Sequence, residues 1–199
     1  MPQHETTETR ILTEAAEHLR RYGPGRTTVT AIAEALGMSH ANVYRYYPSK
    51  AAMIEAVSEV WLRPIESTLH DIADGPDPAD DKLERMLGAL GRAYRSKLED
   101  DPRIFALFAT AMSEGQAVAR RHRTRIQAEM GRVVEDGLGA GAFTAQDQRR
   151  AMALIFDVLH RFIHPVSVAL DRTLPRGQID IRFERAVRLT LRALAQGVA

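Results

Sequence analysis

The 199-residue sequence contains no cysteine, which excludes disulfide bonds, thiol catalysis and thiolate metal sites. It also lacks an excess of either charge, because 27 lysine and arginine residues stand against 26 aspartate and glutamate residues. A chain so nearly balanced is not a general binder of polyanions, so contact with nucleic acid would require locally concentrated positive charge. We find no apolar run that approaches the roughly 20 residues needed to span a bilayer, and no apolar signal core. These absences predict a cytoplasmic protein without a membrane partner.

Motifs for common enzyme chemistry are absent as well. The sequence has no nucleophile elbow, no Walker loop and no dinucleotide-binding glycine pattern, so we expect neither catalysis nor a cofactor. From residue 80 onward no run of alternating apolar and polar residues is long enough for a strand, whereas helical spacing recurs. With 45% hydrophobic residues, a helical chain of this length can hold a small and a larger subdomain. The sequence therefore predicts an all-α fold in two parts.

The first part contains a segment, residues 27–50, with the residue types of a helix-turn-helix motif. Gly37 can adopt the positive φ that a short turn between helices requires, and Ser39 can cap the second helix. The apolar positions spaced to face inward are Ile32, Leu36, Met38, Val43 and Tyr46. The positions left outward are His40, Ala41, Asn42, Tyr44 and Arg45. Their mixture of donors, acceptors and apolar groups suits base edges and predicts a DNA-reading helix; an ordinary helical hairpin is the alternative.

The next predicted helix supplies a further contact to DNA. Pro48 ends the second helix of the motif, and Ser49 can cap the helix that follows. Lys50 then falls in a first turn, where backbone N–H groups already favour an anion. We expect Lys50 to contact a phosphate of double-stranded DNA.

Three segments in this region resemble a known family: RILTEAAEHLRRYG at 10–23, TTVTAIAEALGMS at 27–39 and VYRYYPSKAAM at 43–53. Together they are similar to the DNA-binding domain of the TetR family of bacterial transcription regulators. The resemblance covers about the first third of the chain. It implies a transcription regulator, most often a repressor, whose last two long helices form a homodimer.

The resemblance also implies roles for individual residues. Thr28 would cap the helix before the turn and touch phosphate, and Tyr47 would close the three-helix core. Contacts to backbone phosphates are implied for Tyr44, Tyr46 and Lys50. His40 and Ala41 depart from the family, which often has lysine or another polar residue and then glycine at these places. The base preference is therefore open.

The rest of the chain is expected to form helices with a few marked interruptions. Pro64 should kink or restart the helix that leaves the motif, and Asp101 with Pro102 should cap and start a short apolar helix. Ser113 should start the following helix. A long helix is expected from Ala145 to about Leu170, apolar enough to face its own core and a second subunit.

The last predicted helix, after Pro175 and Gly177, offers a second broad apolar surface. Two such helices per chain can form a four-helix interface in a homodimer. A homodimer reads a palindromic operator with two recognition helices about 34–36 Å apart, and a change of that spacing acts as a switch. We expect a small-molecule effector to control the spacing.

Large apolar and aromatic residues are candidates to line an effector cavity, which suits a hydrophobic or aromatic molecule. They are Trp61, Tyr94, Phe105, Phe108, Met112, Phe156 and His160. Plain core packing is the alternative for each of them. Asp157, His160 and His164 share a helix face and could hold a metal ion, but no second ligand cluster supports this, and capping or core hydrogen bonds are the alternative.

One predicted helix carries a dense basic cluster. Its members are Arg120, Arg121, His122, Arg123 and Arg125. They spread around the helix instead of forming one stripe, which favours a solvated face over a second polyanion site.

The predicted organisation is a helix-turn-helix DNA-binding domain at residues 1–50, a connecting helix and linker at 51–78, and a helical effector-binding and dimerisation domain at 79–199. The predicted function is sequence-specific transcription regulation, with release from the operator by the effector. The alternative is a ligandless DNA-binding or protein-interaction helical module.

Overall fold

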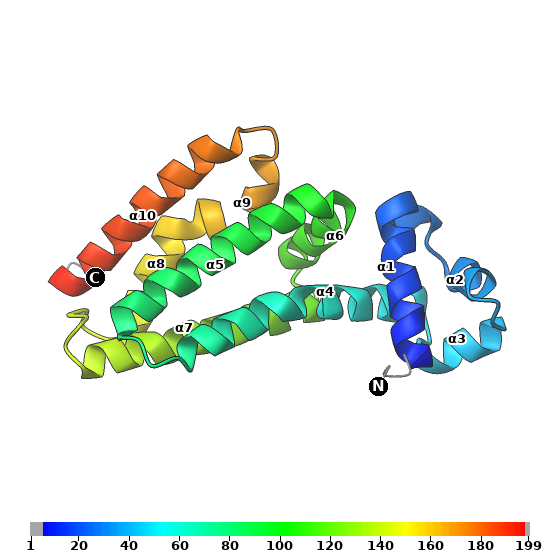
Figure 1. Cartoon of the computed structure of the whole chain (residues 1–199), viewed down its shortest axis with the longest axis horizontal. Coiled ribbons are helices and arrows are strands. Elements are labelled where there is room, and N and C mark those ends of the chain that lie inside the picture. The colour runs from blue at the N-terminus through cyan, green and yellow to red at the C-terminus, as the bar shows by residue number, and fades with distance from the viewer. Residues whose placement is uncertain (1–5, 198–199) are drawn as a thin grey trace.

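A computed structural model of the chain describes residues 6–197, and within that range it contains helices and no strand (Figure 1). The first five helices are α1 (Thr7–Arg26), α2 (Val29–Ala35), α3 (His40–Tyr46), α4 (Lys50–Ala73) and α5 (Ala79–Asp100). The others are α6 (Pro102–Ser113), α7 (Ala117–Gly139), α8 (Gln148–Ile163), α9 (Pro165–Leu170) and α10 (Arg176–Gln196). The predicted all-α fold is confirmed.

The helices form a small head, α1 to α3, at one end of an elongated molecule, and a larger body, α5 to α10 (Figure 1). Helix α4 runs from the head into the body, where it packs against α5 and α7. Helix α1 contacts both α4 and α6, so the head touches the connecting helix and also the body. Helix α10 packs on α5 and α8 along the outer edge of the body.

Of the two outcomes predicted for Pro64, a kink or a restart, the restart is wrong, because α4 runs through the proline as one helix. A proline removes one backbone donor, which weakens a helix interior by about 3 kcal/mol. Leu62, Ile65 and Leu69 are buried on both sides of the proline, and this packing holds the helix together. The connection between head and body is therefore one continuous helix.

Helix α6 begins at Pro102 as predicted, but one predicted cap and one predicted helix start differ in the structure. Asp101 precedes Pro102 as expected, but its carboxylate makes no capping hydrogen bond to α6, because it accepts hydrogen bonds from two other helices. Ser113 ends α6 instead of starting the next helix, and its hydroxyl donates to the carbonyl of Thr110 at 2.9 Å. Helix α7 begins only at Ala117.

The predicted helix from Ala145 to Leu170 is divided into α8 and α9 at His164, since Pro165 cannot continue the hydrogen-bond ladder. Asp147 caps α8 by accepting from the N–H of Arg150 at 2.8 Å. By length and composition alone, the segment Gln148–Leu170 could cross a membrane, which corrects the expectation that no run approaches that size. One such segment is weak evidence, because core helices of proteins that span no membrane pass the same test.

A close approach in the body depends on Gly91 of α5. A Cβ at this position would lie 2.5 Å from the ring of Phe183 in α10, closer than real contacts allow. We expect Gly91→Ala to lower the free energy of unfolding by about 1–2 kcal/mol, because overpacking at about 1–3 kcal/mol outweighs the gain in helix propensity of about 0.5–1 kcal/mol. Urea unfolding at fixed protein concentration measures the change.

The matched control is Gly139→Ala on α7, where nothing lies within 4 Å of the added atom. Removing the ring as well, in Gly91→Ala with Phe183→Ala, should cancel the penalty of the alanine. Additive losses in the double variant would contradict the steric account.

Candidate functional site

The turn between α2 and α3 is built as the sequence predicts. Gly37 has a φ of 63°, a conformation that favours glycine, and the N–H of Met38 donates to the carbonyl of Ala33 at 2.9 Å. The hydroxyl of Ser39 accepts from the N–H of Asn42 at 3.2 Å and caps α3. Thr28 caps α2 in the same way, at 3.1 Å from the N–H of Ala31. The bond between Met38 and Ala33 fixes the end of α2, and the bond between Asn42 and Ser39 fixes the start of α3. The orientation of α3 relative to α2 is thereby set.

The core of the head lies beneath α3. Ile32, Ala33 and Val43 are fully buried, and Tyr47 is 6% exposed. The hydroxyl of Tyr47 donates to the Glu8 carboxylate at 3.3 Å. Burial, with Glu8 beside it, raises the pKa of Tyr47 to about 12. Tyr47 therefore stays neutral and ties the end of α3 to α1.

The opposite face of α3 is open to solvent. Exposed side chains on this helix are His40, Ala41, Tyr44 and Arg45. Asn42 is half-buried, and its side-chain oxygen accepts a hydrogen bond from Arg45 at 3.0 Å. Tyr46, which the sequence assigned both to the core and to phosphate contact, is half-buried with Arg45 stacked 5.3 Å from its ring centre.

The electrostatics of this face favour an anion. No aspartate or glutamate occurs from residue 35 to residue 54, and this stretch contains Arg45 and Lys50. Ser49 caps α4 by accepting from the N–H of Ala52 at 3.0 Å, which places the half-buried Lys50 as the first residue of that helix. The head and the first turn of α4 thus present local positive charge and hydrogen-bonding groups on a chain whose net charge is only +1.

The carboxylate of Asp101 joins the head to the body. It accepts from the guanidinium of Arg20 in α1 at 2.6 Å and from the indole N–H of Trp61 in α4 at 2.8 Å. Burial alone would raise the pKa of Asp101, but these two hydrogen bonds hold it below its usual value. Three helices that are distant in sequence therefore meet on one charged group.

Two cations complete this junction. Arg103 donates to the backbone carbonyls of Arg20 and Arg21 at 2.6 Å each. These carbonyls lie just before Gly23, where the backbone of α1 departs from helical geometry. Lys97 donates to the carbonyl of Trp61 at 2.6 Å, and its ammonium lies 4.2 Å from the centre of that indole ring. Burial lowers the pKa of Lys97.

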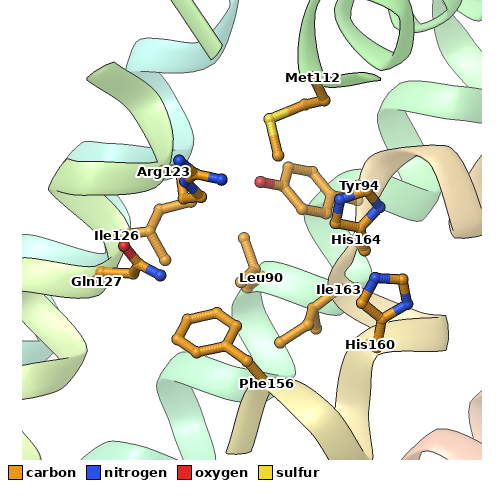
Figure 2. Close-up of a pocket in the computed structure, with 10 residues that line it drawn as sticks. All are labelled: Leu90, Tyr94, Met112, Arg123, Ile126, Gln127, Phe156, His160, Ile163 and His164. Atoms are coloured by element: carbon orange, nitrogen blue, oxygen red, sulfur yellow. The ribbon is translucent and has the colours of Figure 1, made fainter. Parts of the chain in front are cut away.

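The body contains a partly open cavity of about 170 Å³ among α5, α6, α7 and α8. Figure 2 shows the ten residues that line it. Four of them are among the predicted lining residues: Tyr94, Met112, Phe156 and His160. The six others are Leu90, Arg123, Ile126, Gln127, Ile163 and His164.

Three of the predicted lining residues do not reach this cavity. Phe105 and Phe108 are fully buried, and Trp61 is 8% exposed. Their rings pack edge to face with centre-to-centre distances of 6.1 to 6.3 Å. These aromatic residues are core: Phe105 and Phe108 also pack against Tyr94 of the cavity wall, and Trp61 donates to Asp101 at the junction.

The polar lining residues lie on two sides of the cavity. Arg123 and Gln127 project from α7, and His160 and His164 stand together opposite them (Figure 2). The two imidazole rings are stacked, with centres 4.4 Å apart and planes 13° from parallel. Burial lowers the pKa of His164, and the neighbouring His160 and Arg123 lower it further.

Arg123 was not among the residues predicted to line the cavity, although helical spacing could have identified it as a lining residue. Residues 121 and 125 are four apart and share a face of α7, whereas residue 123 points to the other side of the helix. Arg121 pairs with Glu55 and Glu59 of α4, and Arg125 pairs with Glu59 and Glu66. In the basic cluster, Arg121, His122 and Arg125 therefore pair with glutamates of α4, Arg120 donates to the carbonyl of Gly115, and Arg123 lies in the cavity wall.

A buried hydrogen-bond chain connects the cavity wall with α4. The hydroxyl of Tyr94 lies 3.0 Å from Nε2 of His122, and Nδ1 of His122 lies 2.7 Å from the carboxylate of Glu66. Burial would raise the pKa of Glu66, but its bonds to His122 and Arg125 lower it below its usual value. Tyr94 and His122 are almost fully buried, so these contacts are shielded from water.

The metal hypothesis finds no support in the part of the chain that the structure describes. No group of three or more His, Cys, Asp or Glu side chains there could hold a metal ion. His160 instead contacts the hydroxyl of Ser167 at 3.2 Å, and Asp157 is exposed.

Together, a capped helix-turn-helix head and an all-helical body with a cavity define a class of protein, the two-part DNA-binding regulators. Comparison with known proteins agrees. The family profile described as "Bacterial regulatory proteins, tetR family" matches residues 11–57, and that described as "Tetracyclin repressor-like, C-terminal domain" matches residues 79–186. The chain belongs to the TetR family, whose members are transcription regulators and not enzymes.

Three individual proteins similar to the chain share between 20% and 31% sequence identity with it. The HTH-type transcriptional regulator RutR of Escherichia coli is 31% identical over 112 residues, which is 53% of this chain and 47% of that protein. The chain thus spans about half the length of the curated relatives it matches. A TetR/AcrR-family regulator from Thermobifida fusca has a TM-score of 0.68 at 20% identity, covering 92% of this chain and 96% of that one. A tetR-family regulatory protein from Rhodococcus RHA1 has a TM-score of 0.61 at 25% identity, with coverage of 94% and 96%.

Proposed function

We propose that this chain acts in the cytoplasm as a homodimeric transcriptional repressor that binds a palindromic operator and is released by a small-molecule effector. The observation that carries the proposal is the solvent-facing side of α3, which offers donors, acceptors and a methyl group beside Arg45 and Lys50. An α-helix fits the major groove, where these groups meet base edges. Ser39, Thr28, Tyr44, Tyr46 and Lys50 are assigned to the phosphate-contacting border of this surface.

The organisation into parts follows the helices. We assign residues 1–50 to the DNA-binding head, 51–78 to the connecting helix and linker, and 79–199 to the effector-binding and dimerisation body. The third helix of the head ends at Tyr46, α4 spans Lys50–Ala73, and α5 begins at Ala79. These boundaries keep every helix within one part apart from the first residue of α4.

Apolar side chains on the outer helices support dimerisation. Val158 of α8 is 43% exposed, and Ile181 and Leu189 of α10 are 60% and 58% exposed. Helices α8 and α10 pack against each other, so these exposed apolar side chains lie on neighbouring helices, as an interaction surface would require. Two copies joined through α8 and α10 would form a four-helix interface and place two α3 helices on one duplex.

Release by an effector needs only modest energy. A tenfold loss of operator affinity requires about 1.4 kcal/mol of differential effector binding to the two arrangements of the heads. The cavity wall reaches α4 through Tyr94, His122 and Glu66, and α4 carries the head. These contacts support a path from cavity to operator.

The test of the proposal is selection of the preferred duplex from random sequences. We expect a palindromic consensus with half-sites about one helical turn apart, bound specifically and in a salt-dependent manner. A ligandless protein-interaction module would show no preference over competitor DNA.

Asn42→Ala separates base reading from phosphate contact. We expect this variant to lose roughly 1–3 kcal/mol of discrimination between the selected duplex and single-base variants, because the amide and Arg45 form one hydrogen-bonded pair on the exposed face. The control Lys50→Ala should weaken all duplexes alike and reduce the salt slope by about one. Fluorescence anisotropy titrations measure both quantities. Equal loss on specific and non-specific duplexes for Asn42→Ala would refute its role as a base reader.

A further inference from the structure

We propose that the effector of the cavity is a small hydrophobic carboxylic acid, bound as its carboxylate. The carboxylate would lie against Arg123 and the imidazoles of His160 and His164, with the apolar part of the molecule between Ile126 and Phe156. This inference rests on the proposed function, since it names the chemical class of the effector for the same cavity.

The first argument is the charge of the wall. The ten lining residues include one guanidinium, two imidazoles and one amide, but no aspartate or glutamate. A cavity whose wall holds a guanidinium and no carboxylate stabilises a negative charge and disfavours a positive one.

The second argument is the position of Arg123. Its neighbours Arg121 and Arg125 are neutralised by glutamates of α4. Within residues 6–197, Arg123 makes no ion pair or hydrogen bond with another side chain, and it lines the cavity instead. A guanidinium offers a planar fork of N–H donors that matches a carboxylate in a bidentate manner.

The third argument is a buried polar atom. Among the described residues, Nδ1 of His164 is buried without a hydrogen-bond partner. An unsatisfied buried polar group is unfavourable, and because His164 lines the cavity, a rotation of its ring that turns this nitrogen inward would let a ligand oxygen or N–H satisfy it. A carboxylate accepts a hydrogen bond from an imidazole N–H and offsets the positive charge of Arg123 across the cavity.

The shape of the remaining wall sets the size of the acid. Leu90, Ile126, Phe156 and Ile163 form an apolar lining (Figure 2). The cavity of about 170 Å³ is close to an apolar cavity of about 150 Å³ that binds benzene in another protein. One aromatic ring or a short alkyl chain fits this space. The single permanent cation matches a monoanion, whereas a phosphate dianion would leave a charge uncompensated in a largely apolar site.

Isothermal titration calorimetry on the full chain tests the inference with matched pairs of probes. Benzoate, phenylacetate and hexanoate are each compared with the primary amide of the same acid, which keeps the shape and removes the charge. We expect at least one acid of the panel to bind, and its amide to bind at least about tenfold more weakly. Bound acid should also reduce affinity for the selected operator duplex.

Arg123→Gln provides the variant, because it removes the charge from an exposed side chain and keeps a polar group of similar length. The variant should bind the acid at least about tenfold more weakly and the amide unchanged. The control Arg149→Gln removes the same charge near the start of α8, away from the cavity lining, and should bind the acid normally. Melting temperatures of both variants confirm folding.

Equal binding of acid and amide, unchanged acid binding by Arg123→Gln, or binding of no acid in the panel would overturn the inference. These results leave the repressor proposal intact if the chain still selects a palindromic duplex. Absence of any selected duplex overturns the repressor proposal itself.

Discussion

A chain carrying both Ile181→Glu and Leu189→Glu is expected to be monomeric and to bind the palindromic operator at least about 1000-fold more weakly than the unaltered chain. Both side chains are more than half exposed on α10, so the replacements leave the fold of the monomer intact. In a dimer joined through α10 the new carboxylates would be buried without partners, which costs several kcal/mol each.

The size of the loss follows from the division of the binding energy between two heads. A nanomolar complex corresponds to about −12 kcal/mol, and a single half-site retains roughly half of that energy. The monomer would then bind in the micromolar range or more weakly. Specific recognition would vanish against the non-specific background, which has dissociation constants of about 10⁻⁴–10⁻⁶ M.

Sedimentation velocity gives the oligomeric state, and anisotropy with the selected duplex gives the affinity. Val60→Glu is the control, because it places the same charge at an apolar side chain of α4 that is 45% exposed. This control should remain dimeric. A double α10 variant that stays dimeric at micromolar concentration would show that the two copies meet elsewhere.

The second large effect is expected at the junction between head and body. We expect Asp101→Ala to lower the free energy of unfolding by about 2–4 kcal/mol, because it leaves the buried indole N–H of Trp61 without its acceptor and leaves Arg20 with only the exposed Glu17 as a partner. This loss is smaller than the roughly 3–5 kcal/mol that is typical when a fully buried ion pair is broken, because the guanidinium of Arg20 is partly exposed. Asp100→Ala is the control, because this neighbouring carboxylate is exposed.

The same group predicts a dependence of stability on pH. The pKa of Asp101 is lower in the folded chain than its ordinary value of about 3.9. Its contribution is therefore fully present above that ordinary value and is lost as the pH falls through the lowered folded pKa. Asp101→Ala should lack this part of the acid-induced loss, so the stability difference between variant and unaltered chain should shrink below about pH 4.

Chemical unfolding at neutral pH and at a series of acidic pH values measures both effects. If the difference between the two chains were constant over the whole acidic range, the carboxylate would not be the source of the stability. A loss equal to that of Asp100→Ala would show that the junction is held by packing alone.

Local features of the head could be predicted from sequence because they depend on neighbours a few residues apart. Gly37 adopts positive φ because it lacks a Cβ, and Ser39 and Ser49 cap the helices that directly follow them. The burial of Ile32 and Val43 follows from helical periodicity. The placement of Tyr47 in the core was implied by the resemblance of residues 10–53 to the TetR family, and Tyr47 is buried there.

The cavity could be predicted only in part. Periodicity marks which residues of the body are apolar, but it does not say which apolar residues meet another helix and which meet an empty space. Trp61, Phe105 and Phe108 are aromatic like Phe156, but their rings pack against one another and do not line the cavity. Arg123 was grouped with its basic neighbours because the partners of those neighbours lie on α4, more than 50 residues away in sequence.

The sequence by itself determined the helical class, the turn and caps of the DNA-reading head, and the absence of thiol chemistry, since each depends on residue type and short-range spacing. Only the tertiary structure decided that α4 continues through Pro64, that Asp101 binds Arg20 and Trp61 instead of capping α6, and that Arg123 faces a cavity. Each of these outcomes depends on groups brought together from distant helices. The energy of such contacts, at one to several kcal/mol, exceeds the local preferences that the sequence displays.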